Sequence, residues 1–379
     1  MSKPSANQDR LRPRPAIVSM EPYRPPSSGR QKKMRLDFNE NTVGCSPRVL
    51  QRLKKIVAQD LAVYPEYEQA LAKFTAYFQV ERDQMTLTNG TDEAIQLVVN
   101  TYVSDGDTVV VLRPTYAMYR FYSQVAGARI VEVDYLADLR FPEAKLLRAV
   151  NARTKLIFVA NPNNPTGTSA SPDQLRGIIE SAPKAAVMVD EAYFEFFGQT
   201  ALPWIENYPN LFVSRTFSKA FGLAAFRLGC LFSQAGNIEK IRKAQSPYSV
   251  NTPAVLCALE AIQDVGFVKK YVSEVLRARQ MLCQELNRLG WEFFPSSANF
   301  VLVDFGPAAE AMRRALGEHE ILVRDRSYEL PGCVRITVGT VAQTRELIGV
   351  LRRLSEGRKS ILHIGANGTP RDGDTKRSS

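Results

Sequence analysis

Short, continuous runs of apolar residues recur along this chain, and each run ends in a polar or turn-forming segment. The segment 184–193, KAAVMVDEAY, has five apolar residues before Asp190, and 155–167, KLIFVANPNNPTG, repeats the design. Because these runs are continuous rather than alternating, they predict strands covered on both faces, as in a parallel sheet. Their alternation with loops and helical patterns predicts an α/β fold with right-handed crossovers. Ser171–Pro172 predicts the start of one such helix.

Polar residues follow these strands at the edge where open α/β sheets bind ligands. Asp190 and Tyr193 follow one run, and Asn164 lies in the turn of asparagine, proline and glycine after the other. Adjacent residues of a strand point to opposite faces, so Asp190 and Glu191 cannot flank one bond as the two acids of a glycosidase do. Each residue alone also fits an ordinary role, as a helix cap, a turn residue or a core tyrosine.

A single lysine lies in the segment 215–229, RTFSKAFGLAAFRLG, which follows a third apolar run at 211–213. An amine whose pKa is lowered by burial or by a cationic neighbour becomes a nucleophile and forms a Schiff base with a carbonyl, so Lys219 is a candidate catalyst. Thr216, Ser218 and Arg227 supply hydroxyl donors and a charged fork for an anion. Together these groups are what a phosphorylated aldehyde cofactor needs. The alternative is a solvated lysine at the end of a strand.

A second candidate for anion binding lies earlier, in 87–103, LTNGTDEAIQLVVNTYV. A strand-like piece ends at Asn89–Gly90, and Thr91 then opens a helical pattern. Helix N-termini offer unpaired N–H groups and a positive dipole end, so phosphate binds there readily. An ordinary helix cap would give the same pattern. After the next apolar run, Tyr116 is placed where its ring could stack on a flat cofactor.

In order and spacing, eight segments of the chain resemble the fold-type I pyridoxal-phosphate aminotransferases, and within them the histidinol-phosphate aminotransferases. The resemblance runs from about Glu21 to Leu354. It implies a fold-type I transferase with a mainly parallel sheet in a large domain, a smaller α+β domain, and pyridoxal 5′-phosphate as the cofactor. The segments are LDFNEN, AVYPEY, NGTDE, RPTYAMY, NPNNPTG, VDEAYFEF, RTFSKAFGLAAFRLG and CVRITVGT.

The resemblance also implies roles for individual residues. Lys219 resembles the lysine that holds the cofactor and then moves the proton, and Asp190 resembles the partner of the pyridinium nitrogen. Asn164 and Tyr193 resemble the two donors to the ring oxygen. The residues at phosphate-holding positions are Gly90, Thr91, Thr216, Ser218 and Arg227.

Further residues match positions beyond the cofactor ring. Tyr64 matches a tyrosine that reaches the phosphate in the neighbouring subunit, which implies a homodimer with shared sites. Arg335 resembles the arginine that clamps the substrate anion as a bidentate fork. Tyr23, Asn39 and Arg324 lie where this subfamily contacts the substrate. Arg324 would add a second charge for a substrate phosphate, or it could form only a surface ion pair.

The implied reaction is transamination between histidinol phosphate and 2-oxoglutarate in histidine biosynthesis, with Lys219, Asp190 and Tyr193 as catalytic groups. Small-molecule amines and 2-oxo acids are therefore the expected partners. Two other activities of this scaffold stay open, namely transamination of aromatic amino acids and decarboxylation of threonine phosphate. A further alternative is a non-catalytic binding protein whose basic ends contact an acidic partner.

The formal net charge of +10 is confined to the two ends of the chain. Residues 1–36 hold nine Lys or Arg against two acidic residues, and 358–379 hold five against two, so the body between them is formally neutral. Such a distribution argues against nucleic-acid recognition. His319 and His363 are the only histidines, which disfavours a Ser-His-Asp triad and a histidine-rich metal site, and no metal is expected.

Other features bear on localisation. Five scattered cysteines, odd in number and without ligand-like spacing, suit a reducing cytoplasm. The arginine- and proline-rich start lacks the apolar core of a secretory signal, and its prolines oppose the amphipathic helix of a transit peptide. No apolar run approaches membrane length, so no membrane span is expected.

At 379 residues and 45% apolar content, the chain is long enough for two domains. Pieces of an N-terminal arm are expected to complete the smaller one. The predicted division is an arm at 1–36, a small α+β domain from 37–45 and 265–357, a large cofactor-binding domain at 46–264, and a disordered basic tail at 358–379.

Overall fold

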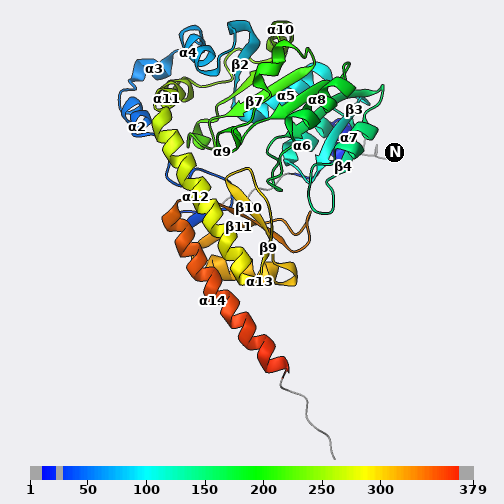
Figure 1. Cartoon of the computed structure of the whole chain (residues 1–379). Coiled ribbons are helices and arrows are strands. Elements are labelled where there is room, and N and C mark those ends of the chain that lie inside the picture. Colours follow the sequence, from blue (N-terminus) through cyan, green and yellow to red (C-terminus); the bar gives the residue numbers. More distant parts are fainter. Residues whose placement is uncertain (1–10, 23–28, 367–379) are drawn as a thin grey trace, which may run out of the picture.

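The computed structural model describes residues 11–22 and 29–366, with side chains described as far as Glu356. Tyr23, which was predicted to contact the substrate, lies outside the described residues. Two separate sheets form the body of the molecule, and the long helix α12 (Val265–Leu289) runs from the larger one to the smaller one (Figure 1). None of the described helices is both long and apolar enough to span a bilayer.

The larger sheet has seven strands in the order β2-β8-β7-β6-β5-β3-β4. From β7 to β4 all neighbours are parallel, whereas β8 is antiparallel to both β2 and β7. The strands are β2 (Met85–Thr88), β3 (Thr108–Arg113), β4 (Arg129–Asp134), β5 (Thr154–Ala160), β6 (Ala186–Asp190), β7 (Leu211–Thr216) and β8 (Gly229–Phe232).

Both faces of this sheet are covered, as the continuous apolar runs predict. In β6 every residue is buried, and Val187 and Val189 belong to one apolar cluster while Met188 belongs to the other. Residues of α5 (Gly90–Tyr102), α6 (Ala117–Val125) and α10 (Ala235–Ala244) join the Met188 cluster. Residues of α8 (Pro172–Ser181) join the Val187 cluster, and Ser171 caps this helix as predicted. The predicted α/β class is confirmed.

Further helices complete the large domain and its borders. Most of them contribute to the Val187 cluster or connect strands at the sheet edges. They are α1 (Pro15–Val18), α2 (Pro47–Leu53), α3 (Ala58–Ala62), α4 (Glu68–Phe78), η1 (Arg82–Gln84), α7 (Glu143–Ala149), α9 (Phe194–Phe197), η2 (Leu202–Glu206), η3 (Ala224–Phe226) and α11 (Thr252–Gln263).

The smaller sheet has five strands in the order β1-β11-β12-β10-β9. Its edge strand β1 pairs in parallel with β11, so a piece of the N-terminal arm completes this domain, as expected. The helix α14 packs along α12. The elements are β1 (Met34–Leu36), β9 (Glu292–Phe294), β10 (Phe300–Asp304), η4 (Gly306–Ala308), α13 (Ala309–Glu318), β11 (Ile321–Asp325), β12 (Cys333–Thr337) and α14 (Val341–Ala366).

The C-terminal end differs from the prediction. Residues 358–366, assigned to a disordered tail, continue α14 as helix. The glycine, asparagine, aspartate and serine that favour disorder are concentrated after Ile364, whereas the residues just before it favour helix. For the two folded domains we propose the borders predicted from the sequence, after residues 45 and 264, since α2 begins one residue after Ser46 and α12 one residue after Asp264.

Candidate active site

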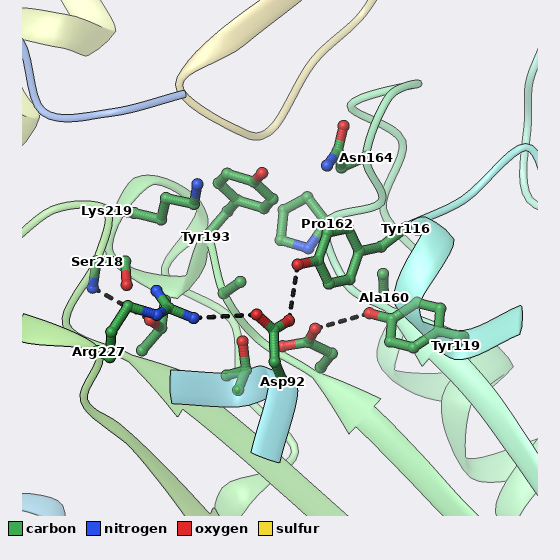
Figure 2. Close-up of a pocket in the computed structure, with 14 residues that line it drawn as sticks. Asp92, Tyr116, Tyr119, Ala160, Pro162, Asn164, Tyr193, Ser218, Lys219 and Arg227 are labelled. Carbon is green, nitrogen blue, oxygen red and sulfur yellow. Dashed lines mark hydrogen bonds and ion pairs between the residues drawn. The ribbon is translucent and has the colours of Figure 1, made fainter. Parts of the chain in front are cut away.

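A pocket with about 570 Å³ of free space opens where β5, β6 and β7 end (Figure 2). This is the edge of a parallel sheet at which α/β proteins bind ligands. Nine residues predicted for the site line it together: Thr91, Tyr116, Asn164, Asp190, Tyr193, Thr216, Ser218, Lys219 and Arg227. Asp92, Tyr119, Ala160, Pro162 and Ala192 complete the lining.

Asp190 is a buried carboxylate at the end of β6 that is held by neutral groups. The Tyr119 hydroxyl donates to its Oδ2 at 2.7 Å, and the Ser214 hydroxyl donates to its Oδ1 at 2.8 Å. Burial raises the pKa of Asp190, and these two hydrogen bonds oppose the shift. Within the described part of the chain it has no ion pair, so its charge is available to a cation brought by a ligand.

Lys219 lies in the same pocket, in the loop after β7, and is partly buried. Its Nζ donates to the Phe38 carbonyl at 3.2 Å and lies 5.9 Å from the centre of the Tyr193 ring. The pKa of Lys219 is lowered from 10.5 to about 8, mainly by burial and secondly by the nearby positive charge of Arg335. No carboxylate pairs with it among the described residues. The amine is therefore neutral often enough near neutral pH to act as a nucleophile or base.

The predicted phosphate-binding residues converge on one end of the pocket. Thr91 lies at the N-terminus of α5, and Thr216 and Ser218 lie at and just after the end of β7. Gly90 has φ +72°, and a Cβ at this position would lie 2.5 Å from Nη2 of Arg227. The left-handed φ favours glycine at this position, and the missing Cβ leaves room for Arg227 beside the helix N-terminus.

Asp92 lies between Arg227 and Tyr116 in the pocket (Figure 2). The Tyr116 hydroxyl donates to Oδ1 of Asp92 at 2.7 Å, and Nη2 of Arg227 lies 3.0 Å from the other oxygen of Asp92. The Tyr116 ring borders the pocket and packs edge-on against the Tyr119 ring. Its predicted stacking on a cofactor stays a prediction.

Asn39 connects the small domain to the pocket without lining it. Its side-chain nitrogen donates to the Tyr193 hydroxyl at 2.9 Å, and Oγ1 of Thr337 in β12 donates to its oxygen at 3.0 Å. Burial raises the pKa of Tyr193, which keeps its hydroxyl protonated and able to donate a hydrogen bond. Asn39 itself has φ 56°, a conformation that asparagine adopts more readily than most residues.

Arg335 is buried in β12 and also reaches the border of the pocket. Its Nη1 donates to Oδ1 of Asn164 and its Nη2 to the Asp37 carbonyl, both at 2.5 Å. Burial lowers the pKa of Arg335 to about 10. Arg324 lies directly opposite Arg335 across the β11–β12 pair, and among the described residues it forms no ion pair. Two arginines are thus cross-strand neighbours in the small sheet, and one of them reaches the border of the pocket.

Tyr64 lies apart from this pocket. Its side chain is 75% exposed and stacks on Tyr248 with ring centres 4.5 Å apart. Within one chain it therefore completes no part of the site.

The structure adds three residues that the sequence analysis did not assign to the site. Tyr119 and Ser214 hold Asp190, and Asp92 contacts Arg227. Tyr119 could have been found because it lies three residues after Tyr116, in the first turn of the helix that Tyr116 precedes. Ser214 carried a weaker signal, as the first polar residue after the apolar run of β7. The sequence carried no signal for Asp92, because its partner Arg227 lies 135 residues away.

The fold and the lysine-containing pocket define the chain as a fold-type I transferase. Residues 31–351 match the model of the family "Aminotransferase class I and II", and the chain belongs to this family. The predicted family resemblance, enzyme class and pyridoxal phosphate cofactor are thereby confirmed.

Individual relatives are similar over nearly their full length. The chain is 36% identical to the histidinol-phosphate aminotransferase of Caldanaerobacter subterraneus subsp. tengcongensis, over 85% of this chain and 93% of that protein. It is also 36% identical to the enzyme of the same name from Symbiobacterium thermophilum, over 91% of this chain and 99% of that protein. The solved structure of histidinol-phosphate aminotransferase from Sinorhizobium meliloti in complex with pyridoxal-5′-phosphate has a TM-score of 0.82 at 26% identity, and covers 92% of this chain and 99% of its own.

Proposed function

We propose that this enzyme transfers the amino group of histidinol phosphate to 2-oxoglutarate. The observation that supports catalysis most strongly is the pair Lys219 and Asp190. An amine with a pKa of about 8 and a buried carboxylate face one pocket, and neither has an ionic partner among the described residues. Unpaired buried charges are costly unless a ligand completes them.

The donor set of the pocket fits pyridoxal phosphate. Asp190 would face the ring nitrogen, Tyr193 and Asn164 the ring oxygen, and Lys219 the aldehyde. Thr91, Thr216, Ser218 and Arg227 would bind the phosphate, which Gly90 admits because it lacks a side chain. Bound there, the cofactor supplies an aldehyde and a protonated ring that draws electrons from the substrate α-carbon.

The residues of this chain supply the proton transfer and the substrate contacts. Lys219 is placed to take the α-proton as a base, because its lowered pKa leaves the amine neutral in part of the population. Asp190 would supply a negative charge at the far end of the pocket, where a protonated ring nitrogen would balance it. Tyr193 is held in place by Asn39, which donates to its hydroxyl.

Two arginines support a phosphate-bearing substrate. Arg335 and Arg324 lie opposite each other on β12 and β11, and Arg324 forms no direct ion pair in the described chain. Two neighbouring cations suit a phosphate dianion better than a single carboxylate, because each can contribute a charge-assisted hydrogen bond. The names of the curated relatives agree with this substrate.

A single half-reaction tests the proposal. The enzyme loaded with pyridoxal phosphate is mixed with histidinol phosphate in the absence of 2-oxoglutarate, and the absorbance of the cofactor is followed. We expect rapid loss of the visible band of the aldehyde form, and its return when 2-oxoglutarate is added. Histidinol without phosphate is the matched control, and it should react much more slowly.

Other outcomes identify the alternatives. A faster half-reaction with phenylalanine or tyrosine than with histidinol phosphate would make the chain an aromatic aminotransferase. Release of carbon dioxide from threonine phosphate without any need for 2-oxoglutarate would make it a decarboxylase. A protein that binds pyridoxal phosphate but reacts with none of these amines would remove the proposed substrate and leave only the family.

We propose that two copies of the chain share their sites. Large apolar side chains are exposed on the segment from Val43 to Tyr64 and at Tyr248, with exposed fractions from 53% to 75%. Such a group of exposed apolar side chains is typical of a protein interface. Tyr64 lies in this group, so a partner subunit would carry its hydroxyl toward another pocket. The exposed residues are Val43, Leu50, Val57, Leu61, Val63, Tyr64 and Tyr248.

Subunit complementation tests shared sites. Lys219→Ala and Tyr64→Ala chains, each of low activity, are unfolded together and refolded as a mixture. Hybrid dimers would contain one site with both residues intact, so about a quarter of the wild-type activity is expected from random pairing. Mixtures that stay as inactive as their components would contradict sharing.

We also propose a reducing cytoplasm as the location. All five cysteines are free thiols in the structure, and Cys230, Cys257 and Cys333 are buried. A compartment that forms disulfides would not favour this usage.

A further inference from the structure

Asp92 is an acidic side chain among the groups that would bind the cofactor phosphate. It follows Thr91 in the first turn of α5, and its Oδ2 lies 3.0 Å from Nη2 of Arg227. The side chains of Arg227 and Asp92 are 44% and 30% exposed, so both are accessible through the pocket. The proposed catalytic mechanism uses Arg227 but gives Asp92 no role.

A carboxylate at this position conflicts with a bound phosphate. A phosphate monoester carries nearly two negative charges at neutral pH. Asp92 would repel it and would already occupy part of the guanidinium fork of Arg227. The same carboxylate is favourable when no phosphate is present, because an acid in the first turn of a helix stabilises the positive end of the helix dipole.

We propose that Asp92 substitutes for the cofactor phosphate in the cofactor-free protein and releases Arg227 when pyridoxal phosphate binds. In the cofactor-free protein Asp92 holds Arg227 next to Gly90, and its negative charge balances the positive dipole end at the N-terminus of α5. The phosphate then takes over both interactions. This inference rests on the proposed cofactor.

The second contact of Asp92 shows how the carboxylate could be retained after release. The Tyr116 hydroxyl donates to Oδ1 at 2.7 Å, which is not the oxygen that contacts Arg227. Asp92 can therefore lose the arginine and keep the tyrosine. Since the Tyr116 ring borders the same pocket, one carboxylate connects the phosphate end of the site to its aromatic wall.

Binding of two cofactor analogues tests this exchange. Pyridoxine 5′-phosphate and pyridoxine carry an alcohol in place of the aldehyde, so they bind without bonding to Lys219, and they differ only in the phosphate. We expect Asp92→Asn to bind pyridoxine 5′-phosphate roughly twofold to fivefold more tightly than the wild type, as for the loss of one partly exposed competing ion pair. Its affinity for pyridoxine should be unchanged.

Glu93→Gln provides the matched control. It removes the same charge one residue further along α5, where the carboxylate accepts from the Asn89 backbone and the Ser249 hydroxyl and does not contact Arg227. Little change in the affinity for pyridoxine 5′-phosphate is expected. An equal gain in both variants would mean that long-range charge alone acts, and would overturn the exchange.

Thermal unfolding without ligand gives a second readout. Asp92→Asn should melt about a degree or two below the wild type, because it loses the charge at the helix N-terminus, and should gain more than the wild type from pyridoxine 5′-phosphate. Weaker binding of the phosphate analogue by this variant would overturn the inference and make Asp92 a supporting ligand. If the wild type bound neither analogue, the proposed cofactor would fail and the inference with it.

Discussion

Asp190 and Glu191 are neighbours in the sequence, but they lie on opposite sides of the end of β6 and have different surroundings. Glu191 accepts from Nε of Arg215 at 2.6 Å and from the Ala201 backbone at 2.6 Å, and its ion pair with Arg215 is almost fully buried. Asp190 is also buried, but its hydrogen-bond donors are neutral, namely the hydroxyls of Tyr119 and Ser214 and the Ala192 backbone.

The difference separates a structural charge from a functional one. A buried charge needs a partner, and Glu191 finds one within the chain. On the pocket side, Asp190 and Lys219 have no ionic partner among the described residues, although both belong to the same pocket. The incomplete pairing on one side of β6, beside complete pairing on the other, is what identifies the ligand side. The following changes are designed to break or sharpen this contrast.

The largest effect is expected from Lys219→Ala. Without the amine the enzyme loses both its nucleophile and its base, and turnover should fall by about 10⁴-fold. Pyridoxal phosphate should still bind, but without a covalent bond, so dialysis should remove it. Lys155→Ala, which changes an exposed lysine of β5, is the control and should retain full turnover. Near-normal turnover of Lys219→Ala would remove Lys219 from the mechanism.

Arg335→Lys should have the next largest effect. Lysine keeps the charge but cannot donate to both Asn164 and Asp37 while clamping an anion. We expect kcat/KM for the amine substrate to fall roughly 10- to 100-fold, with little change in cofactor affinity. Steady-state kinetics and a cofactor titration separate the two effects. Arg353→Lys, exposed on α14, is the control. A loss confined to cofactor affinity would contradict the substrate role.

The pH dependence of cofactor capture should reflect the lowered pKa of Lys219. Only the neutral amine reacts, so the rate at which cofactor-free protein takes up pyridoxal phosphate should rise about tenfold per pH unit below 8 and level off above it. The contribution of Lys219 to the stability of the fold also rises with pH. Between pH 8 and 10.5 the unfolded amine holds its proton and the folded one does not, so this residue makes the protein more stable as pH rises.

Stopped-flow absorbance measures this capture rate. Lys219→Ala gives the background, which should not show the inflection. A rate that keeps rising to pH 10, as for an ordinary exposed lysine, would contradict the lowered pKa.

The smallest effect is expected from Tyr119→Phe. It removes one hydroxyl from Asp190, while the ring remains stacked on Phe158 with centres 4.7 Å apart. We expect turnover to fall about threefold to tenfold, with thermal stability nearly unchanged. Tyr122→Phe lies on the same helix without contacting Asp190, and should match the wild type. A loss as large as that of Lys219→Ala would assign Tyr119 a direct chemical role.

The strands that build the site were predictable because each has a local pattern. The apolar runs before Asn164, Asp190 and Lys219 became β5, β6 and β7, and their ends meet at the pocket. The small-domain strands β1 and β9 have three residues each, too few for any periodicity to be seen in the sequence. Helix α14 continued into the predicted tail because apolar and basic residues persist to Ile364.

Site residues whose partners are distant could not be predicted in the same way. The contact between Asp92 and Arg227 and that between Asn39 and Tyr193 join segments 135 and 154 residues apart. No local spacing records such a pair, and only the fold brings it together. The contrast between Asp190 and Glu191 also depends on the strand that supplies Arg215 and Ser214.

The most direct test of this contrast is the free energy of unfolding of Asp190→Asn and Glu191→Gln, measured with urea, without cofactor and with saturating pyridoxal phosphate. We predict that Glu191→Gln loses about 3 kcal/mol in both conditions, because Arg215 is left buried without its partner. We predict that Asp190→Asn is as stable as the wild type without cofactor but loses most of the stabilisation by pyridoxal phosphate. Equal losses without cofactor in the two variants, or full stabilisation of Asp190→Asn by the cofactor, would contradict the account.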